Sequence, residues 1–213
     1  MTVLVLASAS PARLATLRSA GVEPAVIVSG VDEDALLAAA VEERGKLTPA
    51  ESALLLARAK AEAVRSDGAL VLGCDSVLEL DGEAFGKPDS AAEAVVRWRA
   101  MRGRSGVLHT GHWLVDHRVG RTGSAGDVAS TTVHFADVTD EEIDAYVATG
   151  EPLRVAGAFT IDGLGGPYVH GVEGDHHTVV GLSLPLLRVL LGELGITWHE
   201  LWTPAESAGK LER

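Results

Sequence analysis

This sequence has few of the residues that mark several common classes of protein. It contains one cysteine, three phenylalanines and two tyrosines, and no apolar run long enough to span a membrane. A single cysteine excludes an intrachain disulfide, and no basic segment of a signal peptide precedes Val3. We therefore expect a cytoplasmic protein with no membrane partner, in which Cys74 is a buried, reduced thiol.

Positive charge is also scarce. The chain has 18 Lys and Arg against 30 Asp and Glu, which gives a formal net charge of −12. Such a chain binds nucleic acid poorly, so we expect no nucleic-acid partner, and a polyanionic ligand would need a few placed cations and a divalent metal. The eight histidines show no metal-ligand spacing. His109 and His112 fall on opposite faces of an expected strand and His176-His177 in a loop, so we interpret them as structural or solvated.

Apolar runs that alternate with capped helices predict an α/β fold around a mixed sheet. Residues 1–202 are expected to form one domain and residues 203–213 a flexible tail. The turn Asp81-Gly82 predicts a hairpin. The expected strands are 3–6, 25–28, 69–74, 77–80, 83–85, 107–117, 129–135, 158–161, 168–172 and an edge strand at 197–202. The expected helices are 11–20, 49–66, 91–101, 140–150 and 182–194, with an acidic loop at 30–34.

The corner after the first strand is a candidate phosphate site. Strand 3–6 runs into Ser8 and Ser10, and Pro11 suits the first position of a helix with Ser10 as its N-cap. A helix N-terminus offers free N–H groups and attracts anions, and Arg13 adds a full charge. The alternative is an ordinary strand-to-helix turn.

Four further residues are candidates for chemistry. Asp75 is expected to end a buried strand, at the edge where α/β proteins bind ligands, although a lone Asp there is more often a turn or cap residue than a catalyst. Lys87 is held in extended geometry by Pro88, or lies in a surface turn. Lys60 lies among alanines, where lysines commonly snorkel, and Glu33 lies in the acidic loop, where solvated charge is the default.

Together and in this order, these motifs resemble the Maf family of nucleoside triphosphate pyrophosphatases. The resemblance covers the chain from Val3 to about Gly195. Its motifs read Ser8-Ala9-Ser10-Pro11-Ala12-Arg13, Glu33, Lys60-Ala61, Asp75-Ser76, Gly86-Lys87-Pro88, Ser105-Gly106 with His109-Thr110-Gly111, Gly150-Glu151-Pro152 with Ala156-Gly157-Ala158-Phe159, and Val179-Val180-Gly181-Leu182-Ser183-Leu184.

The resemblance implies hydrolysis of a nucleoside triphosphate to the monophosphate and pyrophosphate, as house-cleaning of modified or non-standard nucleotides. It implies an elongated mixed sheet flanked by helices, with a nucleotide cleft between two lobes, and a homodimer. Asp75 would accept a proton, and Asp75 and Glu33 would hold Mg²⁺ or Mn²⁺. The implied catalytic residues are Asp75, Glu33, Lys60 and Lys87, and the implied phosphate ligands are Ser8, Ser10, Arg13, Lys60 and Lys87. The alternative is a catalytically weak nucleotide-binding regulator of cell division and septum formation.

Three positions resemble those that distinguish substrates within the family, namely Ala12, Ser76 and Asp162. Ala12 and Val155 stand where relatives carry cations. Asp162 only accepts hydrogen bonds, whereas a guanine edge donates them and the uracil carbonyls accept. We therefore hypothesise a pocket that prefers a guanine-like or modified base.

Overall fold

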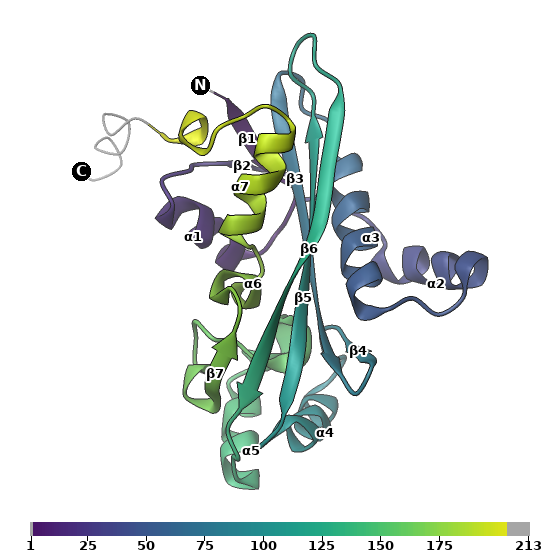
Figure 1. Ribbon diagram of the computed structural model, residues 1–213. Coiled ribbons are helices and arrows are strands. Elements are labelled where there is room, and N and C mark those ends of the chain that lie inside the picture. Colours follow the sequence, from purple (N-terminus) through teal and green to yellow (C-terminus); the bar gives the residue numbers. More distant parts are fainter. Residues whose placement is uncertain (1, 204–213) are drawn as a thin grey trace.

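The computed structural model describes residues 2–203, and within this range the strands form one mixed sheet of seven strands flanked by helices (Figure 1). The strand order is β2-β1-β3-β5-β6-β7, and β4 pairs with β3 off this path. The α/β fold class predicted from the sequence is confirmed. The expected tail lies outside the described residues, apart from Thr203. Among residues 2–203, no helix combines the length and apolar character that crossing a membrane requires.

The parallel part of the sheet is formed by the strands around β1. There β1 pairs with β2 on one side and with β3 on the other, and all other pairs are antiparallel. The strands are β1 Val3–Leu6, β2 Ala25–Val26, β3 Ala69–Leu80, β4 Glu83–Phe85, β5 Ser105–Asp116, β6 Gly123–Phe135 and β7 Val169–Glu173.

The helices begin where side-chain caps predict. Ser10 accepts from the Arg13 N–H, and Thr48 and Thr139 form reciprocal capping boxes with Glu51 and Glu142. The helices are α1 Pro11–Ser19, α2 Glu33–Arg44, α3 Pro49–Glu62, α4 Ala91–Met101, α5 Asp140–Ala148, α6 His176–Val180 and α7 Leu184–Glu193. Short 3₁₀ turns occupy Pro152–Arg154, Ala156–Ala158, Gly166–Tyr168 and Trp198–Leu201.

Several sequence expectations about local structure are wrong. The expected strand 158–161 is absent from the described structure, because Gly157 has φ +70° and Ala158 φ +58°, which turn the chain out of an extended path. The expected edge strand 197–202 is mostly a 3₁₀ turn, with one bridge between Val22 and Trp202. His176 and His177 lie in helix α6, not in a loop, because Asp175 caps it. The left-handed Gly181 then separates α6 from α7, so the last helix starts later than predicted.

Strand β3 is one continuous strand of 12 residues, whereas the sequence predicted a strand end at Asp75. The strand continues because its partners change along its length. β1 pairs with it from Ala69 to Leu72, β4 pairs with it from Leu78 to Leu80, and β5 pairs along nearly all of it. Asp75 therefore lies in mid-strand, just beyond the carboxyl end of β1.

Helix α3 packs directly onto β3 and β5 because two strand glycines leave room for its backbone. A Cβ at Gly73 would overlap the carbonyl oxygen of Ala57, and a Cβ at Gly111 would overlap that of Ala53. Ala53, Ala57 and Ala61 are fully buried on the facing side of α3. Small side chains on both partners thus bring the helix axis close to the sheet.

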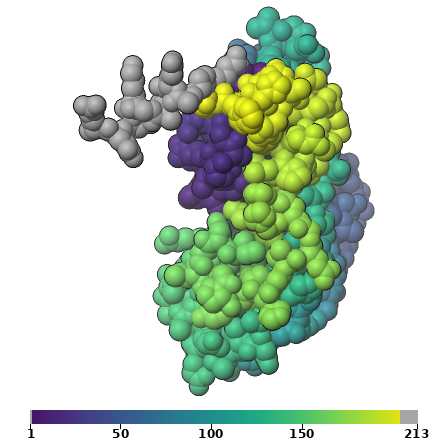
Figure 2. Space-filling view, turned by 60° about the vertical axis from the view of Figure 1, so that its left-hand side comes forward, coloured from purple at the N-terminus to yellow at the C-terminus, as the bar shows by residue number. Residues whose placement is uncertain are grey.

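Different helices cover the two ends of the sheet. Around β1, α1 and α7 enclose a core that includes Leu6, Leu72 and Leu187, and Cys74 is a buried free thiol there, as expected. At the other end, a second core forms around Trp98, whose indole N–H donates to the Ala158 carbonyl at 2.8 Å. In Figure 2 the N- and C-terminal segments lie together at one end, and the segment coloured green forms the other. This elongated arrangement agrees with the expected two lobes.

We predict that Gly73→Ala lowers the free energy of unfolding by about 1–3 kcal/mol, because the added methyl group forces α3 away from the sheet. Urea denaturation measures the change. Gly192→Ala in α7 is the control, since nothing lies within 4 Å of the position its methyl group would take, and it should be neutral or stabilising by up to about 1 kcal/mol. Unchanged stability of Gly73→Ala would contradict the close approach.

Candidate active site

Three residues predicted from the sequence meet beyond the carboxyl end of β1. The Lys60 ammonium lies 2.5 Å from Asp75 Oδ1 and 2.8 Å from Glu33 Oε1. The side chains of Lys60 and Asp75 are only 10% and 12% exposed, whereas Glu33 is 41% exposed. The lysine therefore does not snorkel into solvent. Its single positive charge neutralises one of the two carboxylate charges.

Glu33 reaches this cluster from a helix, which corrects the expected acidic loop. Asp32 accepts from the Ala35 N–H and caps α2, so Glu33 is the first helical residue. Ala40 is the single buried residue of α2, so the helix has no broad apolar stripe that the sequence could reveal. The cap fixes the backbone of Glu33 where its carboxylate meets Lys60 of α3.

Arg13 is a buried junction between α1, β1, β3 and the turn before α7. Its Nε donates to the Gly181 carbonyl at 2.7 Å, and Nη1 donates to Ser8 Oγ at 3.1 Å and the Cys74 carbonyl at 2.8 Å. Nη2 donates to Ser76 Oγ at 3.1 Å. Four of the five N–H groups of a guanidinium are thereby directed at protein oxygens, and one Nη2 proton is left for a ligand.

A chain of hydrogen-bonded hydroxyl groups connects Arg13 with β3, β5 and α6. Thr110 donates to the Thr178 carbonyl at 2.9 Å, so Ser76 donates to Thr110 Oγ1, also at 2.9 Å, and accepts from Arg13. Gly181 permits the close packing here, because its φ is +110° and a Cβ would lie 3.2 Å from Arg13 Nε. Ser76 thus serves the framework of the site, whereas the sequence associated it with base specificity.

Strand β3 has an open edge between its two edge partners, which means that no strand pairs with it there on one side within the described chain. β1 pairing ends at Leu72, which also accepts from the Ala7 N–H, and β4 pairing starts at Leu78. The next carbonyl on this edge, that of Cys74, accepts from the Arg13 side chain instead of from a strand. The Lys60 cluster and Arg13 therefore both border residues 73–77, where the sheet lacks a strand on one side within the described chain.

Ser8 and Ser10 form the corner as the sequence predicted. Ser10 caps α1, with the Arg13 N–H 3.4 Å from its Oγ. Ser8 is buried, and its Oγ accepts from both the Ser10 N–H and Arg13. The hydroxyl proton of Ser8 is left to donate to an incoming anion.

The remaining predicted site residues are Lys87, Asp162 and Ala12, and they take no part in the ion pairs between Lys60, Asp75 and Glu33. Lys87 is exposed after β4, and Asp162 is exposed between two short 3₁₀ turns. Ala12 is half-buried in the first turn of α1. Within residues 2–203, no hydrogen bond or ion pair joins the side chains of Lys87 or Asp162 to Lys60 or Arg13, so a ligand would have to bridge them.

Glu151 fixes the segment that carries Asp162. Its carboxylate accepts from the Tyr146 hydroxyl at 2.9 Å, from the Thr160 hydroxyl at 2.5 Å, and from the N–H groups of Leu164 and Gly165 at 3.0 and 3.1 Å. Burial raises the pKa of Glu151, but these hydrogen bonds outweigh it and the pKa is lowered overall. Sequence reasoning used this residue only as part of a motif and assigned it no role.

His112 holds the turn that supplies the Gly181 carbonyl. Its Nδ1 donates to the Thr110 carbonyl at 3.0 Å, and its Nε2 accepts from the Ser183 N–H at 2.8 Å. Burial lowers its pKa from 6.5 to about 4. The ring is therefore neutral at pH 7, and it is a structural histidine as the sequence predicted.

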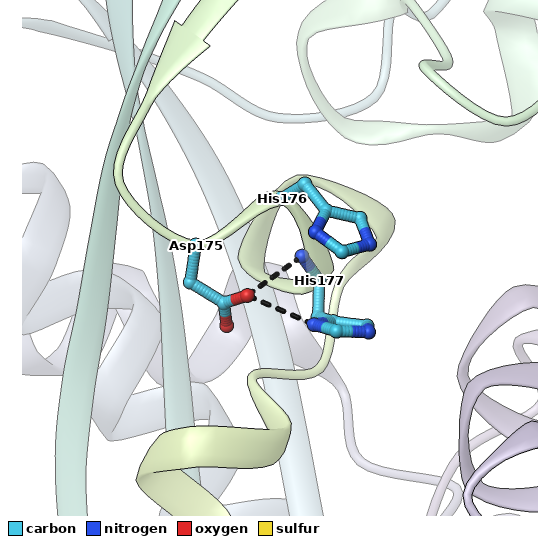
Figure 3. Close-up of side chains that lie close together, drawn as sticks. All are labelled: Asp175, His176 and His177. Atoms are coloured by element: carbon cyan, nitrogen blue, oxygen red, sulfur yellow. Dashed lines mark hydrogen bonds and ion pairs between the residues drawn. The ribbon is translucent and has the colours of Figure 1, made fainter.

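A second group of titratable side chains lies at the start of α6 (Figure 3). Ligand atoms of Asp175, His176 and His177 all lie within 4.8 Å of one another, which is close enough to share a metal ion. Asp175 Oδ1 accepts from both the N–H and the Nδ1 of His177, at 3.1 and 2.9 Å. These bonds are those of an N-cap, so Asp175 is explained as the cap of α6. The centroids of the two imidazole rings lie 3.8 Å apart, with the ring planes tilted by 36°.

Known proteins match this chain over nearly its whole length. The family model described as Maf-like protein matches residues 3–194. The chain belongs to the Maf family. Proteins named nucleoside triphosphate pyrophosphatase from Streptomyces avermitilis and Salinispora tropica are each 59% identical to it, over 95% and 96% of this chain and 96% and 89% of their own length. A relative of the same name from Nocardia farcinica is 52% identical over 94% of this chain and 97% of its own.

Membership of the Maf family gives the geometry a chemical context. The residues that sequence reasoning missed, Thr110, Thr178 and Gly181, hold Arg13 in place and contribute no charge of their own. Two of these residues stood in motifs, Thr110 in His109-Thr110-Gly111 and Gly181 in Val179-Val180-Gly181, whereas Thr178 directly precedes the second motif. What those motifs lacked was an indication that both segments would meet at one arginine.

We predict that His112 makes the protein less stable as pH falls from about 6.5 to 4. Within this window the unfolded chain binds a proton at His112 that the folded protein excludes, so protonation favours unfolding. The shift corresponds to about 3 kcal/mol. Urea denaturation of wild type and His112→Gln across this range measures it, because the variant lacks this titration. Parallel stability curves for the two proteins would contradict the prediction.

Proposed function

We propose that the protein hydrolyses nucleoside triphosphates to the monophosphate and pyrophosphate, as its relatives' names state for them. The observation that supports this most directly is the pair of carboxylates, Asp75 and Glu33, that hold the buried Lys60 ammonium just beyond the carboxyl end of β1. Arg13, Ser8 and the open edge of β3 lie around the same corner. A site that needed only to bind a polyanion would gain nothing from two carboxylates.

The donor set fits a divalent metal such as Mg²⁺ or Mn²⁺. Asp75 and Glu33 offer carboxylate oxygens from different elements, and both already accept from one cationic group, the Lys60 ammonium. Magnesium binds through one or two carboxylates and keeps several waters. When bound, the metal would neutralise phosphate charge and favour formation of the nucleophile.

In the attack of water at the α-phosphorus, the residues of the chain then have different roles. Asp75 accepts the proton of the attacking water. Ser8, the last Nη2 proton of Arg13 and the capped end of α1 donate to phosphate oxygens. Lys60 and Lys87 balance the charge of the leaving pyrophosphate.

The proposal also covers the metal, the oligomeric state and the location of the protein. We propose Mg²⁺ as the metal, a homodimer as the assembly and the cytoplasm as the location, where the reduced thiol of Cys74 is stable. Release of pyrophosphate from a panel of ordinary and modified nucleoside triphosphates, with Mg²⁺ or Mn²⁺, tests the activity. Nucleotide binding without pyrophosphate release would instead favour a regulator of cell division.

We predict that Asp75→Asn lowers kcat by about 10²–10⁴-fold, because the amide cannot accept the proton of the attacking water. Pyrophosphate release measures turnover, and thermal unfolding verifies that the variant is folded. Asp127→Asn is the matched control, since Asp127 is exposed on β6, and it should retain full activity. Full activity of Asp75→Asn would remove this residue from the mechanism.

We predict that Asp162→Gln shifts base preference from guanine-like towards pyrimidine nucleotides. One lost charge-assisted hydrogen bond is worth about 1.5–3 kcal/mol, so the ratio of kcat/KM for GTP over UTP should fall by about 10-fold or more. Kinetics on GTP, a modified guanosine triphosphate, UTP and dTTP measure the ratio. Preference of the wild type for UTP and dTTP, unchanged in the variant, would refute the hypothesis.

A further inference from the structure

The Lys60 ammonium occupies the position between the two carboxylates where a metal ion would bind. Its distances of 2.5 and 2.8 Å to Asp75 and Glu33 are those of direct ion pairs with both groups. A bridging metal ion needs the same oxygens. The lysine and the metal therefore compete for one position.

Lys60 cannot leave this position without another anion to pair with. Its side chain is 10% exposed, and α3 is held against β3 by the contact at Gly73 and against β5 by the contact at Gly111. Moving a buried ammonium away from its partners costs several kcal/mol unless a new partner replaces them. A phosphate group at the open edge of β3 would be such a partner, because that edge borders both Asp75 and Arg13.

We propose that Lys60 is an internal counter-cation that excludes free divalent metal from Glu33 and Asp75 until a nucleoside triphosphate draws it away. The proposal rests on the proposed function for the identity of the anion. In the ligand-free protein Lys60 neutralises one of the two carboxylates and repels a second cation. When the triphosphate arrives, Lys60 moves to its phosphate oxygens and frees the carboxylates. Metal and nucleotide therefore enter together, and each strengthens the binding of the other.

The test measures binding of Mn²⁺ alone, so it does not depend on turnover. Electron paramagnetic resonance reports the free ion in titrations of wild type, Lys60→Gln and Lys60→Met. Removal of the competing charge should tighten Mn²⁺ binding without nucleotide by at least about tenfold. Lys46→Gln is the matched control, because Lys46 pairs with the exposed Glu83, and it should bind Mn²⁺ as the wild type does.

A second arm measures the coupling between metal and nucleotide. A non-hydrolysable triphosphate with a methylene group between the α- and β-phosphorus should raise the affinity of the wild type for Mn²⁺. The increase should be smaller in the Lys60 variants, whose carboxylates are already free. Affinity for Mn²⁺ that is unchanged or weaker in both folded Lys60 variants, without nucleotide, would overturn the inference. Absence of pyrophosphate release from the wild type would instead overturn the proposed function.

Discussion

The close approach of helix α3 to the sheet is the constraint on which the site depends. The glycines at positions 73 and 111 leave the sheet surface without side chains where the alanines of α3 lie against it. A larger distance between helix and sheet would carry Lys60 away from Asp75. Because the two backbones approach so closely, the Lys60 ammonium reaches the Asp75 carboxylate. The same helix–sheet contact therefore determines both the packing of the core and the position of the charges in the site.

The change of partners along β3 leaves an unpaired strand edge beside this arrangement. A strand that pairs with β1 over its first part and with β4 over its last part leaves residues 73–77 without a paired strand on one side, within the part of the chain that the structure describes. An unpaired strand edge exposes backbone groups that need hydrogen-bond partners. Arg13 satisfies the Cys74 carbonyl from the face covered by α1, and Lys60 approaches from the face covered by α3. The two cations thus reach one edge from opposite faces of the sheet.

The sequence predicted local features well and long-range ones poorly. Ser10, Thr48 and Thr139 cap helices through contacts within three residues, and the hairpin at Asp81-Gly82 follows from two residues with positive φ. Helix α2 was missed because it presents no apolar stripe, and β3 was divided at Asp75 because a charged residue is unexpected inside a buried strand. That charge is tolerated only because Lys60, 15 positions earlier, pairs with it. The family resemblance indicated the site residues. It did not indicate that Arg13 donates to the Gly181 carbonyl, because this contact joins residues that are 168 positions apart in the sequence.

Charge balance explains how so acidic a chain can attract a polyanion. The formal charge of −12 repels a triphosphate at long range, so attraction must be local. Arg13 and Lys60 together cancel Asp75 and Glu33, which leaves the ligand-free corner near neutral. A triphosphate would bring several negative charges into it, more than one free guanidinium proton and a capped helix can balance. In the proposed order of binding, a divalent cation that arrives with the nucleotide would correct this excess, and the carboxylates would be free to hold it once Lys60 had turned to the phosphates. The same charge count would make a metal bound before the nucleotide unfavourable, because a divalent cation would add two positive charges to a corner whose four charged side chains already sum to zero.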